Sequence, residues 1–251
     1  MAAKRRADQL LVEQGLAESR AKAQALILAG LVSTAGRRVD KPGEQLVADS
    51  ALVLKGRDYP WVSRGGVKLA HALDHFQIDV EGLIALDIGA STGGFTDVLL
   101  SLGAKRIHAV DVGHGQLAWK LRQDARVIVH ERLNARHLTR AHIPELVDII
   151  TCDASFIGLA TVLPAPLSLA AERAELVALV KPQFEAGREH VGKGGVVRDP
   201  AVQREVCERA VAWVAAQPGW TAVGIVESPI LGPRGNREFL LYARRSEEGG
   251  R

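Results

Sequence analysis

The sequence predicts an α/β protein in which a seven-stranded, doubly wound sheet follows a small α+β module. Two patterns support this fold class. From residue 82 onward, short apolar runs alternate with helical stretches, which is typical of a sheet with helices on both faces. Before residue 60, two short helices and several short strands are expected instead. With 251 residues, 47% of them hydrophobic, the chain can form one large and one small domain.

The first module begins with two helices. The segment RADQLLVEQG predicts a helix that Gly15 ends, and ESRAKAQALILAG predicts a second helix from a serine cap to Gly30. Turns at residues 35–36 and 41–43 then separate short β segments. Apolar residues of the second helix are expected to share one face, away from Arg20, Lys22 and Gln24. They are Ala21, Ala25, Leu28 and Ala29.

The positive charge of the chain is concentrated in this module. Residues 1–60 hold ten Lys/Arg against seven Asp/Glu, whereas residues 61–251 hold 22 of each. The whole net charge of +3 therefore belongs to the first quarter of the chain. A compact basic module beside a neutral domain indicates an anionic partner, most often nucleic acid.

The segment KGRDYPWVSRGGVKLAHAL joins the two domains. Its proline and its glycine pair interrupt regular secondary structure, so we expect the first domain at residues 1–59 and a linker at 60–66. The second domain is expected at residues 67–246, beginning with a helix over 67–76. A disordered tail is expected at residues 247–251.

Seven apolar segments are expected to form the sheet, with the last two as a β pair. Because ligands of doubly wound sheets bind beyond the C-terminal ends of the strands, the site should lie at that edge. The segments are LIALDIG, RIHAVDVG, RVIVH, VDIITCD, ELVALVK, WTAVGIVES and REFLLYARR.

A glycine-rich turn follows the first of these strands, in LDIGASTGGFTDVLL. Its glycines allow a sharp turn and a close approach to a ligand, but the spacing is not the G-x-G-x-x-G of dinucleotide-binding proteins. Asp87 ends this strand, and Asp111 ends the next strand, where a carboxylate can accept both hydroxyl groups of a ribose. This pattern favours S-adenosylmethionine over a nicotinamide cofactor.

Residues after the third and fourth strands complete the expected pocket. Asn134 should reach the same edge as Asp153, either as a contact to adenine or as a simple turn residue. The expected cofactor-binding residues are Asp87, Gly89, Ala90, Ser91, Thr92, Gly93, Gly94, Phe95, Asp111, Val112, Asn134 and Asp153.

Four charged residues occupy comparable places in the expected fold. Lys68 lies near the start of a helix, Asp153 and Lys181 end two strands, and Glu238 begins the last strand. Each one alone would more often be a solvated or salt-bridged residue. Together, at one edge of a sheet, they can converge beside the cofactor.

The chain contains the motifs SRGGVKL, DIGASTGGFTD, VDVGHGQL, CDASFIGL, LVKPQFEAGREHVGKGGVVRDP and GNREFL. In these motifs it resembles the TlyA family, whose members have also been named haemolysin A. The resemblance implies an S4 RNA-binding domain followed by an FtsJ-like (RrmJ-like) methyltransferase domain. It also implies 2'-O-methylation of a cytidine in ribosomal RNA, with Lys68, Asp153, Lys181 and Glu238 as the catalytic tetrad.

Two groups of RNA-binding residues are expected. The first group is implied by the segment LLVEQGLAESRAKAQALILAGLVSTAGRRVDKPGEQL, which resembles the S4 RNA-binding domain. In the S4-like segment they are Arg5, Arg6, Arg20, Lys22, Arg37 and Arg38, which would otherwise be solvated surface charges. In the larger domain they are Arg64, Arg188, Lys193 and Arg198. The last three lie in a glycine-rich segment expected to be a long mobile loop, and a flexible surface loop without a function is the alternative.

The ribose 2'-hydroxyl is a weak nucleophile, so methyl transfer to it requires a group that removes its proton or stabilises the charge that develops on it. A lysine that removes its proton at neutral pH needs a pKa well below the usual value near 10.4, through burial or a neighbouring cation. Lys68 can be that cation, while Asp153 and Glu238 orient the two amines. Alternatively, Lys181 stays protonated and only positions the hydroxyl. A flipped nucleotide is expected, because a duplex would hide the ribose.

Other functions are less compatible with the composition. No apolar run reaches the roughly 18 residues of a membrane span, no signal peptide is expected, and Cys152 and Cys207 suggest neither zinc nor a disulfide. We therefore expect a soluble, cytoplasmic, monomeric protein without a metal. A membrane-active haemolysin and an S4 RNA-binding protein with an inactive methyltransferase domain remain the rival hypotheses.

Overall fold

The computed structural model describes residues 4–17, 19–54 and 59–246, and the chain divides into two compact units, Met1–Pro60 and Trp61–Arg251. The segment expected to be a linker belongs largely to the second unit, because Trp61 and Val62 pack against its hydrophobic core. The tail expected at 247–251 lies outside the described residues.

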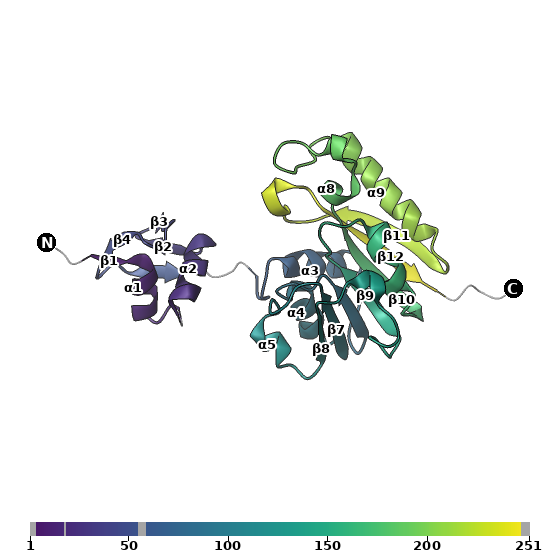
Figure 1. The fold of residues 1–251 in the computed structure, drawn as a ribbon, viewed down its shortest axis with the longest axis horizontal. Coiled ribbons are helices and arrows are strands. Elements are labelled where there is room, and N and C mark those ends of the chain that lie inside the picture. Colours follow the sequence, from purple (N-terminus) through teal and green to yellow (C-terminus); the bar gives the residue numbers. More distant parts are fainter. Residues whose placement is uncertain (1–3, 18, 55–58, 247–251) are drawn as a thin grey trace. The chain divides into compact units, whose positions relative to one another are not determined.

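Within its described residues, the first unit consists of two helices and five short strands (Figure 1). Strands β1 and β4 pair antiparallel, and β3, β2 and β5 form a second antiparallel sheet. The elements are β1 (Lys4–Arg6), α1 (Ala7–Glu13), α2 (Arg20–Leu28), β2 (Val32–Thr34), β3 (Arg37–Arg38), β4 (Gln45–Val47) and β5 (Leu52–Leu54).

The helix ends of this unit follow the sequence signals. The hydroxyl of Ser19 caps α2 by accepting a hydrogen bond from the backbone N of Lys22 at 3.2 Å. Gly15 and Gly30, which follow the two helices, have φ values of +70° and +73°, a conformation that glycine adopts readily. Both predicted helices are confirmed.

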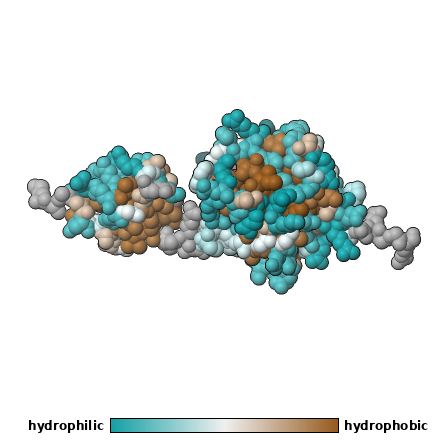
Figure 2. Space-filling view, turned by 90° about the horizontal axis from the view of Figure 1, so that it is seen from below, coloured by the Kyte–Doolittle hydropathy of each residue, from teal (hydrophilic) through white to brown (hydrophobic). Residues whose placement is uncertain are grey.

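The predicted apolar face of α2 is wrong. Its buried residues are Ala23 and Ile27, whereas Leu28 is 70% exposed. An alanine side chain contributes little apolar area to either face of a helix. The spacing of the alanines therefore did not indicate which face of α2 is buried. Figure 2 shows apolar surface on this unit, in which Leu28 and Val53 are exposed large hydrophobic residues.

The second unit contains a seven-stranded sheet, as the sequence predicts. The strands run in the order β11-β12-β10-β9-β6-β7-β8, with β10, β9, β6, β7 and β8 parallel and β12 antiparallel to both of its neighbours. The strands are β6 (Ile84–Ile88), β7 (Arg106–Asp111), β8 (Val127–Glu131), β9 (Val147–Cys152), β10 (Ala170–Val180), β11 (Trp220–Glu227) and β12 (Phe239–Arg245).

Helices cover both faces of this sheet (Figure 1). Residues of α3, α4 and α5 form one core with the sheet, and residues of α6, α7 and α9 form another on the opposite face. The helices are α3 (Gly65–His75), α4 (Gly94–Ser101), α5 (Trp119–Arg122), α6 (Leu159–Val162), α7 (Pro164–Leu167), α8 (Pro182–Glu185) and α9 (Pro200–Ala215), with short turns η1 (Ala135–His137), η2 (Arg188–His190) and η3 (Pro233–Gly235). Helix α3 begins two residues earlier than predicted.

The sheet topology places the expected catalytic residues at one edge. Asp153 and Lys181 directly follow the parallel strands β9 and β10, and Glu238 directly precedes β12. Because β12 is antiparallel to β10, its beginning lies at the edge where β10 ends. The strand order also reverses between β6 and β9, which is where doubly wound sheets bind their ligands.

The segment at residues 187–200 is more ordered than the predicted long loop. It contains η2 and a bridge between Gly192 and Val196. Arg234 Nη1 donates to the carbonyl of Gly194 at 2.9 Å, and Asn236 Nδ2 donates to that of Gly195 at 2.9 Å. These contacts attach the segment to the turn that precedes β12, so its glycines serve a folded structure.

A buried carboxylate holds the first unit together. Asp8 is fully buried, and its oxygens accept hydrogen bonds from Arg6 at 2.9 and 3.0 Å, from Gln24 at 3.0 Å and from Arg20 at 3.3 Å. The Arg6 guanidinium is the main reason why the pKa of Asp8 lies far below the usual carboxyl value. This network joins β1, α1 and α2.

We predict that Asp8→Asn destabilises the first unit by about 1–3 kcal/mol, because three side-chain donors lose a buried, charged acceptor. Hydrogen exchange of the full chain should show lost protection in α1 and α2. The exposed Asp40, which pairs with Arg38, provides the control Asp40→Asn, for which protection should be unchanged. Since the pKa of Asp8 is lowered on folding, this stabilisation is present above about pH 4 and lost as the pH falls further. Equal protection in both variants would contradict the prediction.

Candidate active site

Two adjoining cavities open at the C-terminal edge of the parallel strands. The larger has a volume of about 720 Å³ and the smaller about 290 Å³. Four residues line both of them: Gly89, Ser91, Asp153 and Ser155. A molecule in the larger cavity can therefore reach a second molecule in the smaller one.

The glycine-rich turn after β6 forms the wall between these cavities. Gly89 has a φ of +77°, and a Cβ atom there would lie 3.0 Å from the backbone of Ala154. Gly93 has a φ of +98°, and a Cβ atom there would lie 2.2 Å from the side chain of Leu121. Only glycine fits at both positions, because they combine a left-handed backbone with a close neighbour.

Asp111 is fixed at the larger cavity by two backbone donors. Its Oδ2 accepts from the N of Ser91 at 2.8 Å, and its Oδ1 accepts from the N of Gly113 at 2.6 Å. Each carboxylate oxygen can accept more than one hydrogen bond, so Asp111 retains capacity for ligand hydroxyl groups. Val112, Asn134 and several apolar residues also line this cavity, including Leu133, Phe156 and Ile157.

Two expected cofactor residues line neither cavity. Gly93 packs against α5, and Asp87 is fully buried beneath the turn. Asp87 accepts hydrogen bonds from the hydroxyl groups of Thr96 at 2.6 Å and Thr151 at 3.0 Å. Burial raises the pKa of Asp87 to about 6, although the two hydroxyl groups oppose this shift. The strand-end position alone did not reveal that Asp87 points into the core and supports the turn from below.

The remaining expected cofactor residues divide between the two cavities. Gly89, Ser91, Asp111, Val112, Asn134 and Asp153 line the larger one. Ala90, Thr92, Gly94 and Phe95 line the smaller one, together with Gly89, Ser91 and Asp153.

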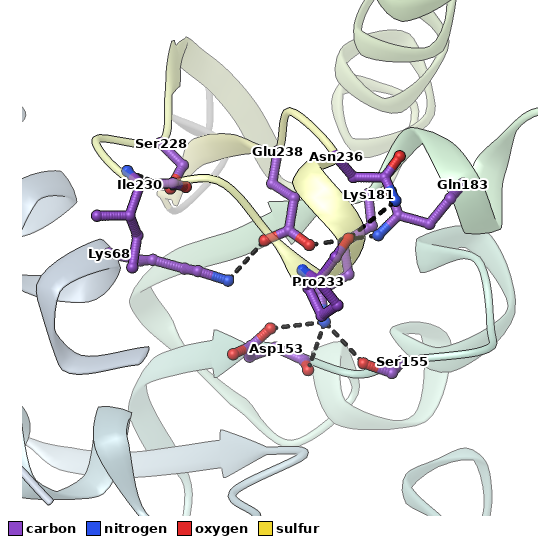
Figure 3. Close-up of polar contacts among 10 residues, drawn as sticks. All are labelled: Lys68, Asp153, Ser155, Lys181, Gln183, Ser228, Ile230, Pro233, Asn236 and Glu238. Carbon is purple, nitrogen blue, oxygen red and sulfur yellow. Dashed lines mark hydrogen bonds and ion pairs between the residues drawn. The ribbon is translucent and has the colours of Figure 1, made fainter. Parts of the chain in front are cut away.

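All four charged residues of the expected tetrad meet at the smaller cavity (Figure 3). They form two ion pairs. Lys68 Nζ lies 2.5 Å from Glu238 Oε2, and Lys181 Nζ lies 2.7 Å from Asp153 Oδ1. Glu238 is fully buried and the two lysines are nearly so. Asp153 thus pairs with Lys181, and Glu238 pairs with Lys68. That the two acids orient the amines for catalysis stays a prediction.

Three oxygen atoms surround the amine of Lys181 (Figure 3). Besides pairing with the Asp153 carboxylate, Nζ donates to the Asp153 carbonyl at 3.0 Å and to the Ser155 hydroxyl at 2.9 Å. An ammonium group has three donors and no acceptor, so this arrangement suits the protonated form of Lys181.

The sequence interpretation missed two polar neighbours of the tetrad. Ser155 contacts Lys181, and Gln183 Nε2 donates to Glu238 Oε1 at 3.3 Å. Both lie two residues after a predicted catalytic residue, in the motifs DASF and KPQF. That proximity was the available signal, but it does not show where a side chain points.

The predicted RNA-binding residues lie on the surfaces of both units. In the first unit Arg5, Arg6, Arg20, Arg37 and Arg38 pair with nearby carboxylates, while Lys22 is exposed. Arg188, Lys193 and Arg198 are exposed in the second unit, and Arg64 lines the smaller cavity. Their roles in RNA binding stay predictions.

Neither a metal cluster nor a membrane span is found in the described parts of the chain. Over residues 4–17, 19–54 and 59–246, no group of three or more His, Cys, Asp and Glu side chains could hold a metal ion. No helix within these same ranges is long and apolar enough to cross a membrane. Cys152 and Cys207 are both buried and unpaired with each other.

Sequence comparisons match both units. The FtsJ-like methyltransferase family model covers residues 61–245, and the S4 domain model covers residues 5–50. The 16S/23S rRNA (cytidine-2'-O)-methyltransferase TlyA of Mycobacterium tuberculosis is 51% identical over 97% of this chain and 91% of its own length. Hemolysin A of Brachyspira hyodysenteriae is 40% identical over 94% of this chain and 98% of its own. Haemolysin names therefore occur within the same family.

Solved structures agree with these matches. A Streptococcus thermophilus protein described as a hemolysin is 45% identical, with a TM-score of 0.76 over 98% of this chain and 90% of its own. The N-methyltransferase NodS of Bradyrhizobium japonicum, in complex with S-adenosyl-L-homocysteine, has a TM-score of 0.52 over 76% of this chain and 94% of its own. At 17% identity, this second likeness shows the fold alone.

The raised pKa of Asp87 predicts a pH dependence of stability. Its pKa is near 4 in an unfolded chain and about 6 in the folded protein. The folded state thus holds the proton more tightly, and a contribution of about 3 kcal/mol, present below pH 4, is lost as the pH rises through 6. Asp87→Asn removes this dependence.

Urea unfolding followed by tryptophan fluorescence can measure this effect, because all four tryptophans lie in the second unit. Relative to the wild type, Asp87→Asn should gain about 2–3 kcal/mol in the free energy of unfolding between pH 4 and pH 7. Asp148→Asn, at another carboxylate of the sheet that accepts a backbone hydrogen bond, serves as the comparison. A pH-independent difference between Asp87→Asn and the wild type would show that Asp87 is not a buried proton-binding group.

Proposed function

This chain belongs to the TlyA family, in which an S4 domain precedes an FtsJ-like methyltransferase domain, and we propose that it methylates the ribose 2'-hydroxyl of a cytidine in ribosomal RNA. The observation that carries this proposal is the pair of buried ion pairs, Lys68–Glu238 and Lys181–Asp153, at a small cavity that adjoins a larger one. The substrate and base identity follow the M. tuberculosis relative.

We propose S-adenosylmethionine as the cofactor in the larger cavity. The residues present fit it, since Gly89 leaves space beside the turn and Asp111 has acceptor capacity for ribose hydroxyl groups. Apolar side chains that line the same cavity, such as Leu133 and Ile157, suit a flat adenine ring. The chemistry that this cofactor supplies when bound is an electrophilic methyl group on a sulfonium.

Lys181 is proposed to act on the ribose hydroxyl from the smaller cavity. Its two hydrogen-bond acceptors and the paired Asp153 carboxylate favour an ammonium group. Nζ then positions the 2'-oxygen and stabilises the negative charge left on it as the hydroxyl proton passes to water during methyl transfer. Of the three oxygen neighbours, the Ser155 hydroxyl is the one that can rotate away, because the others are a backbone carbonyl and a paired carboxylate. The substrate hydroxyl then takes the place of Ser155 Oγ.

The RNA is proposed to contact both units. Arg64 lines the smaller cavity, and the exposed Arg188, Lys193 and Arg198 can bind phosphates along the approach to it. The basic S4 domain supplies a second contact to folded RNA. A flipped cytidine is expected, since the ribose must enter a recessed cavity. We propose ribosomal subunits as the partner, a monomeric protein, no metal and a cytoplasmic location.

The proposed reaction can be tested with ribosomal subunits and cofactor labelled in its methyl group. The wild type should transfer the label to ribosomal RNA, whereas Lys181→Ala should lose about 100-fold or more of the rate and still bind S-adenosylhomocysteine. The exposed Lys105 provides the control Lys105→Ala, which should transfer normally. If the wild type labels no RNA, the protein binds RNA without methylating it. Normal transfer by Lys181→Ala would refute the assigned role.

The cofactor site can be tested without turnover. Asp111→Ala should weaken S-adenosylhomocysteine binding by about tenfold or more, because acceptors for the ribose hydroxyl groups are lost. Isothermal titration calorimetry measures this directly. Asp124→Ala, at a surface carboxylate that pairs with Arg126, should bind like the wild type. Unchanged affinity in Asp111→Ala would place the ribose elsewhere.

A further inference from the structure

Gln183 contacts the most deeply buried member of the tetrad. The Glu238 carboxylate is fully buried and has one donor for each oxygen, Lys68 Nζ at 2.5 Å from Oε2 and Gln183 Nε2 at 3.3 Å from Oε1 (Figure 3). Gly232 closes another side, since a Cβ atom there would lie 2.1 Å from Oε1. The orientation of the carboxylate therefore depends on these two donors.

The chemistry of this contact requires a neutral donor. A carboxylate accepts only from the NH₂ end of an amide, which fixes how Gln183 is turned. Another cation at this position would compete with Lys68 for Glu238, and another carboxylate would repel it. A glutamine can donate to Glu238 without changing the charge of the site.

The opposite end of the same amide is left without a partner. Gln183 Oε1 is buried and makes no hydrogen bond with the described residues of the chain. An unsatisfied buried acceptor costs stability, whereas an apolar side chain of similar size would avoid this cost. Among the described residues, the amide of Gln183 therefore makes its side-chain hydrogen bond through nitrogen alone, and that bond holds Glu238.

The KPQFE segment delivers this donor together with the catalytic lysine. Pro182 begins α8 immediately after Lys181, so the chain turns at the end of β10. Lys181 then reaches Asp153 and Ser155 while Gln183 reaches Glu238. One short segment thus contacts both ion pairs.

We propose that Gln183 is a positioning residue for methyl transfer, which holds Glu238 so that Lys68 and Lys181 stay correctly placed around the ribose hydroxyl. This inference rests on the proposed function. It assigns Gln183 no contact with the cofactor, and the amide acts on the reaction only through Glu238.

Two variants test the role in the same ribosomal-subunit assay. Gln183→Leu should lower kcat by at least about tenfold, because Glu238 Oε1 loses its donor, while the KM for the subunits and the affinity for S-adenosylhomocysteine change less than about threefold. Gln217→Leu removes a comparable amide hydrogen bond, to the carbonyl of Trp213, at the far end of α9. This control should keep the wild-type kcat.

Gln183→Glu provides a readout that a purely structural role would not change. The introduced carboxyl group can donate to Glu238 only while it holds its proton, in a site that also contains Lys68, Lys181 and Asp153. Activity should therefore be retained at acidic pH and fall by about tenfold or more as the pH rises and the proton is lost. The wild type, whose amide has no such proton, should not show this fall.

The outcomes separate this inference from the function on which it rests. If the wild type methylates RNA and both variants keep its kcat and pH profile, Gln183 is not a positioning residue, although the proposed function stands. An equal loss in Gln183→Glu at every pH would likewise indicate only a structural role. A wild type that transfers no methyl group would overturn the proposed function and this inference together.

Discussion

The site depends on two lysine amines that are almost fully buried and are each paired with a carboxylate. An unpaired charge in such a place is costly, and removing one partner of a buried ion pair leaves the other uncompensated. Lys68 is therefore tied to Glu238, and Lys181 to Asp153. The two pairs also share one cavity and one connecting segment. They therefore set the geometry of the cavity in which we propose that the ribose hydroxyl binds.

The sheet topology explains how four distant segments supply these charges. Strands β9, β10 and β12 are neighbours, and the antiparallel direction of β12 brings its first residues to the edge where β9 and β10 end. Helix α3 adds Lys68 from one face of the sheet. The larger cavity lies at the adjoining strands β6 and β7, so the order of the strands places the two cavities of the proposed methyl donor and acceptor side by side.

Much of this arrangement could be predicted from the sequence. Apolar runs located all seven strands, and charged residues at strand ends marked Asp153, Lys181 and Glu238. The same rule failed for Asp87, because a strand-end side chain can point into the core, where Thr96 and Thr151 bind it. The buried face of α2 was predicted wrongly, because alanine side chains are small enough to lie on either face of a helix. Gln183 was missed because its contact with Glu238 joins residues 55 positions apart, and sequence spacing carries no information about such a contact.

The proposed mechanism depends above all on the ribose 2'-oxygen lying beside Lys181. This position can be measured in a structure of the protein with S-adenosylhomocysteine and an RNA that contains the target cytidine. We expect a flipped nucleotide whose 2'-oxygen lies within hydrogen-bonding distance of Lys181 Nζ, roughly 3 Å, with Ser155 Oγ displaced from that amine. A base atom in this position, or a ribose outside the smaller cavity, would contradict it.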